Sequence, residues 1–120
     1  MENFSLRDKP VPLLFVGHGN PMYAIEESSF ADTWRSLGDS LPRPEAILCI
    51  SAHWESNGTF VSSIEKPGTI HDFYGFPEEL FKVQYPAKGS PLLAALTKGI
   101  IKQSDTELDA DRGLDHGCWA

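Results

Sequence analysis

The sequence has few cysteines and few basic residues, and each shortage argues against a class of protein. Two cysteines in 120 residues cannot form the disulfide framework of a small secreted domain. Ten Lys and Arg stand against 17 Asp and Glu, which leaves a formal net charge of −7. Nucleic-acid binding needs a basic surface that neutralises phosphate, so we expect no nucleic-acid partner.

Long apolar runs and targeting signals are also missing. No run of apolar residues is long enough to cross a bilayer, so we expect no membrane partner. Residues 1–5 lack the basic segment and apolar segment of a signal peptide. We therefore expect a cytoplasmic protein with reduced cysteines. The last residues, 112–120, end within what reads as a motif, and we expect the chain to be a fragment.

The residues that are present suit one folded domain, because 41% of them are hydrophobic. Two apolar runs, Val11–Val16 and Ala46–Ile50, predict strands that are buried on both faces. A helix is predicted between them at Ser29–Leu41, from the spacing of its apolar residues. Strand, helix and strand with short links predict a βαβ unit with parallel strands.

The second half of the chain predicts further elements of the same kind. We expect a strand at Thr59–Ile64, one helical turn at Pro77–Phe81, a helix at Ser90–Lys102 and a short strand at Thr106–Leu108. The pattern predicts an α/β fold, with a mostly parallel central sheet flanked by helices in three layers.

A histidine follows each of the two apolar runs. His18 lies just after the first run, and His53 just after the second. Because the carboxyl ends of parallel strands meet at one edge of a sheet, we expect both histidines in one crevice. Neutral imidazoles are common ligands of Fe(II), Zn(II) and Mn(II). The alternative is that both rings hydrogen-bond loop carbonyls, and the spacing alone leaves the two interpretations open.

Two more histidines lie in loops that could reach the same crevice. These are His71 and His116, and each could instead stabilise its own loop by hydrogen bonds. Asp72 follows His71, and Asp115 precedes His116, so each carboxylate could orient an imidazole or form a turn.

The loop that contains His71 is rich in aromatic residues. Phe73, Tyr74 and Phe76 could form the wall of a pocket for a flat ring, or could pack the loop against the protein. A long loop inside a small domain is often functional, so we keep both interpretations.

Five motifs in a fixed order resemble one family. They are Gly17-His18-Gly19-Asn20-Pro21-Met22, Ser51-Ala52-His53-Trp54, Thr69-Ile70-His71-Asp72-Phe73-Tyr74-Gly75-Phe76-Pro77, Tyr85-Pro86-Ala87 and Leu114-Asp115-His116-Gly117-Cys118-Trp119. Together they resemble the class III extradiol ring-cleavage dioxygenases, and most closely the 4,5-DOPA extradiol dioxygenase type. The similarity extends from Leu13 to Trp119.

The resemblance implies roles for individual residues. His18 and His53 match metal-binding histidines of the family. His71 and His116 match histidines near the pocket, and we predict catalytic roles for them. The predicted substrate pocket comprises Asp72, Phe73, Tyr74 and Asp115. The remaining metal ligand and the histidine usually assigned as acid/base lie in the second half of the family's proteins.

The resemblance also implies an activity. We expect a dioxygenase that uses non-haem Fe(II), with Zn(II) as the other candidate, to open the ring of a catechol such as DOPA with O₂. The product would be a muconic-type semialdehyde, and a histidine would accept the hydroxyl proton. Residues 1–120 would be the N-terminal part of one catalytic domain, inactive alone. The alternatives are a zinc-binding, non-oxidative relative and a metal-free truncated module.

Overall fold

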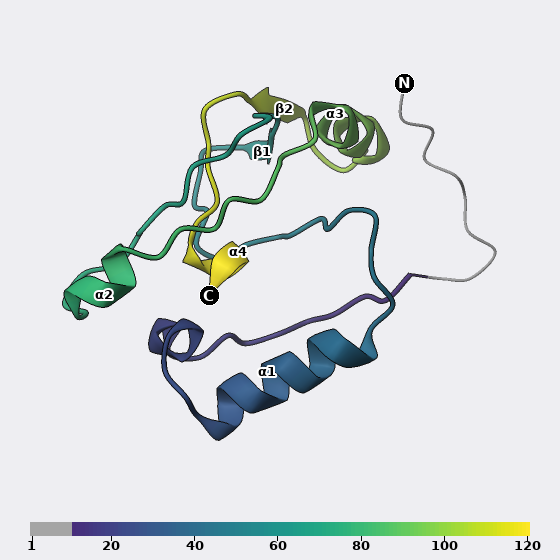
Figure 1. The fold of residues 1–120 in the computed structure, drawn as a ribbon. Coiled ribbons are helices and arrows are strands. Elements are labelled where there is room, and N and C mark those ends of the chain that lie inside the picture. The colour runs from purple at the N-terminus through teal and green to yellow at the C-terminus, as the bar shows by residue number, and fades with distance from the viewer. Residues whose placement is uncertain (1–10) are drawn as a thin grey trace.

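The computed structural model describes residues 11–120, in which a small parallel sheet and several helices alternate along the chain (Figure 1). Its elements, in chain order, are η1 (Pro21–Ala24), α1 (Ser29–Ser40), β1 (Thr59–Ser62), α2 (Glu78–Phe81), α3 (Pro91–Ile100), β2 (Thr106–Asp109) and α4 (His116–Trp119). None of the described helices is long and apolar enough to cross a membrane.

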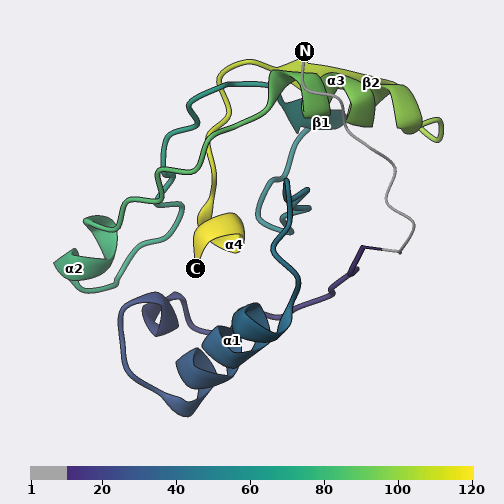
Figure 2. The same cartoon turned by 45° about the vertical axis from the view of Figure 1, so that its right-hand side comes forward.

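The sheet consists of β1 and β2, which pair in parallel. Thr59 lies opposite Thr106, and Ser62 lies opposite Asp109. The connection between the strands contains α2 and α3, and α3 packs against both strands. Figure 2 shows α3 alongside the strand pair, with α1 well away from it. The predicted α/β class, with a parallel sheet flanked by helices, is confirmed.

Local side chains explain where the two longer helices begin. The Ser28 hydroxyl accepts a hydrogen bond from the backbone N–H of Ala31, which caps α1. In the same way, the Ser90 hydroxyl accepts from the N–H of Leu93, and Pro91 stands at the first position of α3, where its missing N–H costs nothing. Both helices were predicted within two residues of their observed bounds.

The predicted strands at Val11–Val16 and Ala46–Ile50 are wrong. Neither segment forms a strand, and the described residues contain only the β1–β2 sheet. An apolar run becomes a strand only when another chain segment pairs with it and other elements cover its faces. Here the apolar side chains remain open to solvent: Leu13 is 97% exposed and Ile50 is 93% exposed. The βαβ unit predicted from these two runs is therefore wrong as well, and the parallel pair of the structure is β1 and β2.

The segments that follow β1 and β2 also run in parallel and are joined by hydrogen bonds beyond the sheet. Thr69 and Leu114 form an isolated parallel bridge, in which the Ile70 N–H donates to the Leu114 carbonyl at 2.7 Å and the Leu114 N–H to the Gly68 carbonyl at 2.8 Å. The bridge sets residues 71–73 beside residues 115–116. It thereby brings together two motifs that are 44 residues apart in the chain.

Candidate metal centre

Three of the four histidines converge on one place. His18, His53 and His116 each offer one ring nitrogen, and these three atoms lie within 4.8 Å of one another. The Nε2 atoms of His18 and His53 are 2.8 Å apart. The ring centroids of His53 and His116 are separated by 3.9 Å, and those of His18 and His116 by 4.9 Å. The site is therefore a compact group of imidazoles from three separate segments.

Each histidine comes to this group on a short, constrained segment. His18 precedes Gly19, whose φ of 71° lies in the left-handed region that glycine adopts easily, just before η1. His53 follows the segment expected to be a strand, and the Trp54 N–H bonds back to the Ser51 carbonyl in a turn. His116 is the first residue of α4, which Figure 2 shows between the sheet and α1.

Asp72 fixes the orientation of the His116 ring. Its Oδ1 accepts a hydrogen bond from His116 Nδ1 at 2.8 Å and another from the His116 backbone N–H at 2.9 Å. A carboxylate only accepts, so the His116 proton resides on Nδ1 and the lone pair on Nε2 is free. Pairing of this kind is typical of histidines that bind metals or accept protons, since it fixes the tautomer and raises basicity.

The electrostatics of the group favour a neutral His18 ring and an ionised Asp72 carboxylate. Burial lowers the pKa of His18, and the neighbouring His116 and His53 lower it further. Burial alone would raise the pKa of Asp72, but hydrogen bonds from the backbone and ring of His116 outweigh it and hold that pKa below its usual value. Neutral histidine is the form that binds metal.

The donor set fits a transition-metal ion. Metal–nitrogen bonds of about 2.0–2.1 Å allow two nitrogens on one ion to lie up to about 4.2 Å apart. The Nε2 atoms of His18 and His53 meet this limit at 2.8 Å, whereas the group of three nitrogens is bounded only at 4.8 Å, so the pair is the part that fits one ion directly. Imidazole nitrogen suits iron, zinc and copper, and does not select among them.

The predicted catalytic residue His71 lies outside the three-histidine group. Its Nε2 donates to the carbonyl oxygen of Val83 at 2.8 Å. Its ring packs against Trp119 with a centroid separation of 5.6 Å, and also contacts the rings of Phe73 and Phe81. In this structure His71 therefore links the aromatic loop to the residues after α2.

The four predicted pocket residues occupy different environments. Asp72 braces His116, and the Phe73 ring lies 5.6 Å from the His116 ring between centroids. Phe73 also packs on Phe76, Phe81 and Trp119. Tyr74 is 92% exposed, whereas Asp115 is buried and hydrogen-bonded. Asp72 and Phe73 contact the His116 side chain, whereas the Asp115 carboxylate acts on His18 electrostatically.

Sequence reasoning missed two residues that contact Asp115. The Ser51 hydroxyl donates to Asp115 Oδ1 at 2.6 Å, and Arg112 Nη2 donates to Asp115 Oδ2 at 2.9 Å. The Arg112 guanidinium also lies over the Trp54 ring, 5.1 Å from its centroid. Ser51 was visible as part of the Ser-Ala-His-Trp motif, but nothing in the sequence links it to a residue 64 positions away.

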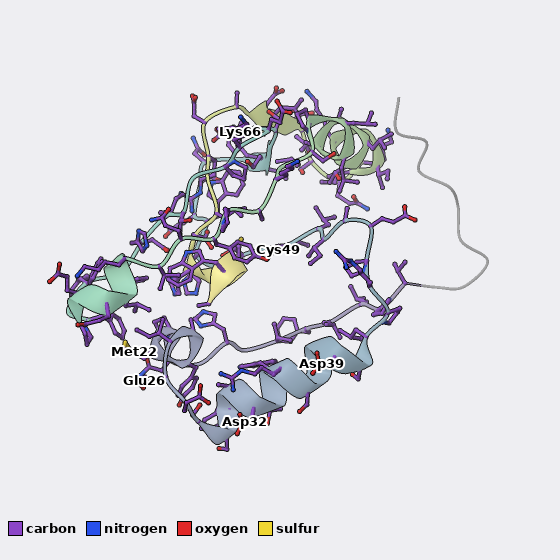
Figure 3. The ribbon with its side chains drawn as sticks, in the orientation of Figure 1. Met22, Glu26, Asp32, Asp39, Cys49 and Lys66 are labelled. Carbon is purple, nitrogen blue, oxygen red and sulfur yellow. The ribbon has the colours of Figure 1, made fainter. Side chains whose placement is uncertain are left out.

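The two cysteines lie at α4: Cys118 is part of this helix, and Cys49 contacts it. Figure 3 shows Cys49 close to α4, and its thiol approaches the Gly117 carbonyl at 3.9 Å. Burial raises the pKa of Cys118 to about 12, with Cys49 and Asp115 adding to the shift. Cys118 is therefore a protonated thiol at neutral pH and a poor metal ligand.

An α/β chain with a parallel strand pair, in which three imidazoles converge and a carboxylate orients one of them, defines a class: α/β proteins with a group of histidines that could hold a metal ion. Comparison with known proteins identifies the family within that class. Residues 12–120 match the family model described as the catalytic LigB subunit of aromatic ring-opening dioxygenase, and the chain belongs to this LigB family.

Curated relatives agree with the family assignment. The chain is 46% identical over 110 residues to the 4,5-DOPA dioxygenase extradiol of Escherichia coli K12, an alignment that covers 91% of this chain and 41% of the relative. It is 42% identical to the protein of the same name from Beta vulgaris and 36% identical to that from Mirabilis jalapa, each over 88% of this chain and 41% of the relative. The chain thus spans about two fifths of the length of these relatives.

Proposed function

We propose that this chain supplies the His18–His53 metal site of an extradiol dioxygenase that opens the ring of a catechol. The observation that supports this most directly is the convergence of His18, His53 and His116, with His116 oriented by Asp72. The similarity to proteins named 4,5-DOPA dioxygenase extradiol supports a catechol of the DOPA type as substrate. Because the alignment covers 41% of those relatives, we assign the activity to the whole gene product that contains residues 1–120 as part of its catalytic domain.

In this proposal His18 and His53 hold the metal through their close Nε2 atoms. The lowered pKa of His18 keeps its ring neutral and able to bind near neutral pH. Non-haem Fe(II), when bound, supplies the Lewis-acid and redox chemistry of ring opening by O₂. His18 and His53 would supply two of the ligands of such an ion.

His116 is the proton acceptor in this proposal. Its Nε2 carries no proton because Nδ1 donates to Asp72, and its ring lies beside the rings of His18 and His53. A catechol bound beside that pair would present a hydroxyl group to this nitrogen, and histidine is suited to general-base chemistry near neutral pH. Asp72 would stabilise the imidazolium that forms. The ring-opened product would be a semialdehyde of the muconic type.

The predicted catalytic role of His71 stays a prediction. Its Nε2 is engaged with the Val83 carbonyl, and its ring packs among aromatic side chains. A direct part in proton transfer would require His71 to break that hydrogen bond. His71 is a matched control for metal binding. It is a histidine in one of the five motifs, but it lies outside the three-histidine group.

The test separates metal binding from proton transfer. The whole gene product is prepared as wild type and as His18→Ala, His53→Ala, His116→Ala and His71→Ala, loaded anaerobically with Fe(II), desalted and analysed for iron. We expect His18→Ala and His53→Ala to lose iron, whereas His71→Ala retains it. We expect His116→Ala to retain most of its iron and to lose formation of the yellow semialdehyde from L-DOPA in air. Undiminished iron in His18→Ala or His53→Ala would refute the proposed ligands.

The same preparation decides which metal is used. Imidazole donors also suit Zn(II), so a zinc-binding, non-oxidative relative uses the same donor set. Elemental analysis of protein purified without added metal, followed by the L-DOPA assay after Fe(II) or Zn(II) loading, distinguishes the two. We expect ring opening only with Fe(II).

A further inference from the structure

The Asp115 carboxylate is buried, with only 2% of its surface exposed. Its charge is balanced by Arg112, whose Nη2 lies 2.9 Å from Oδ2. Its Oδ1 accepts from the Ser51 hydroxyl at 2.6 Å and from the Gly117 N–H at 3.0 Å. A buried carboxylate is stable only when it is paired and hydrogen-bonded, and Asp115 meets both conditions.

Through Ser51, Asp115 connects the segments of two different histidines. The Ser51 Oγ donates to Asp115 and accepts from the backbone N–H of His53 at 3.1 Å. Asp115 itself directly precedes His116 and caps the first turn of α4. The path from His53 through Ser51 and Asp115 to His116 thus consists of two hydrogen bonds and one peptide link.

Close packing supports the same connection. A Cβ added at Gly117 would overlap the Ser51 hydroxyl and lie 2.9 Å from Cδ2 of the His53 ring. The first turn of α4 therefore touches the His53 segment with no room for a side chain. The His53 and His116 rings, 3.9 Å apart between centroids, lie directly beside this contact.

We propose that Asp115 and Ser51 are positioning residues, and that their hydrogen bond fixes the His53 ring relative to the His116 ring. The proposal rests on the proposed function, in which His53 binds the metal and His116 acts beside it. The short O–H···O⁻ bond is charge-assisted, and such bonds are about twice as strong as neutral ones. Its removal would leave an Asp115 oxygen without its hydroxyl partner and the His53 backbone N–H without its acceptor.

The main test is metal binding to variants of Ser51 in the whole gene product. We expect Ser51→Ala to weaken Co(II) binding about 10–100-fold, the usual effect of losing an outer partner of a metal ligand, and to alter the visible Co(II) absorption spectrum. Ser51→Thr keeps the hydroxyl and should restore both. Asp115→Asn, which keeps the shape but not the charge, should weaken binding in the same direction. Ser56→Ala is the control, because the Ser56 hydroxyl donates to the Gly58 carbonyl in the same segment and lies outside the connection.

A second measurement tests positioning in the absence of metal. Histidine ring resonances recorded by NMR on the metal-free protein should shift for both His53 and His116 in Ser51→Ala, and return in Ser51→Thr. If wild type binds no Co(II), the proposed function fails, and these resonances still test the positioning. The positioning inference is overturned if Ser51→Ala leaves them at their wild-type values, or if it binds Co(II) with wild-type affinity and spectrum.

Discussion

His116 shows how one residue acquires a chemical role from its neighbours. As a free side chain it has two interchangeable tautomers, but Asp72 accepts from its Nδ1 and from its backbone N–H. The ring is thereby fixed beside the rings of His18 and His53, and Nε2 is the nitrogen that carries no proton. His71 has its own Nε2 bonded to Val83, and its ring faces aromatic side chains instead. The two histidines differ in hydrogen-bond partner rather than in residue type.

Asp72→Asn tests the dependence of His116 on this carboxylate. An amide cannot stabilise an imidazolium, so we expect the rate of L-DOPA ring opening by the Fe(II)-loaded whole gene product to fall about 10–100-fold. Asp39→Asn, on the exposed end of α1 in Figure 3, is the control and should leave the rate unchanged. A rate for Asp72→Asn equal to that of the control would show that the carboxylate does not support proton transfer.

The aromatic loop 71–77 combines two roles within one element. Phe73 packs on Phe76, Phe81 and Trp119 and also reaches the His116 ring. Tyr74, one residue on, is 92% exposed. Adjacent residues of the loop thus face a packed cluster and the solvent, respectively. The structure places Phe73 in the packed cluster, and the role of Tyr74 as a pocket wall stays a prediction.

Substitutions at these two positions should separate the roles. We expect Phe73→Ala to lower the free energy of unfolding by about 3 kcal/mol, since truncation of a packed phenylalanine removes many contacts. Tyr74→Ala should leave stability within about 0.5 kcal/mol, because exposed side chains contribute little. If Tyr74 forms a wall of the proposed pocket, Tyr74→Ala should instead raise the KM for L-DOPA and leave the iron content unchanged. Denaturant unfolding measures the stability of both variants, and steady-state kinetics measures their KM. An unaltered KM for Tyr74→Ala would show that Tyr74 is not part of the substrate pocket.

At the scale of the whole molecule, the described residues leave many apolar side chains uncovered. Leu13, Phe15 and Ile50 are almost fully exposed, and Ile47 is 73% exposed. Among residues 11–120 the buried hydrophobic residues are few, namely Ala31, Leu80, Ala94 and Trp119. Exposed apolar surface of this extent promotes association between molecules.

We therefore expect residues 1–120, expressed alone, to be oligomeric or poorly soluble and to show no ring-opening activity. Size-exclusion chromatography with light scattering measures the first property, and the anaerobic Fe(II) loading and L-DOPA assay measures the second. Leu13→Lys with Phe15→Lys should reduce association, because both side chains face solvent. The matched control is Ser36→Lys with Asn57→Lys, which adds the same number of lysines and the same charge at exposed, already polar positions. A monomeric wild-type chain that opens L-DOPA would contradict the prediction.

Local signals in the sequence were enough to predict the helices and the short strands, and to single out the histidines as candidate site residues. Ser28 and Ser90 cap helices through bonds that span only three residues, so the sequence is enough to predict them. The strands at Val11–Val16 and Ala46–Ile50 were mispredicted because a strand depends on a distant partner that periodicity does not reveal. Likewise, only the tertiary structure brings Asp72 to His116 and Ser51 to Asp115, contacts between residues 44 and 64 positions apart. The Asp72–His116 contact follows from the parallel bridge between Thr69 and Leu114, and a long-range register of this kind has no local signature in the chain.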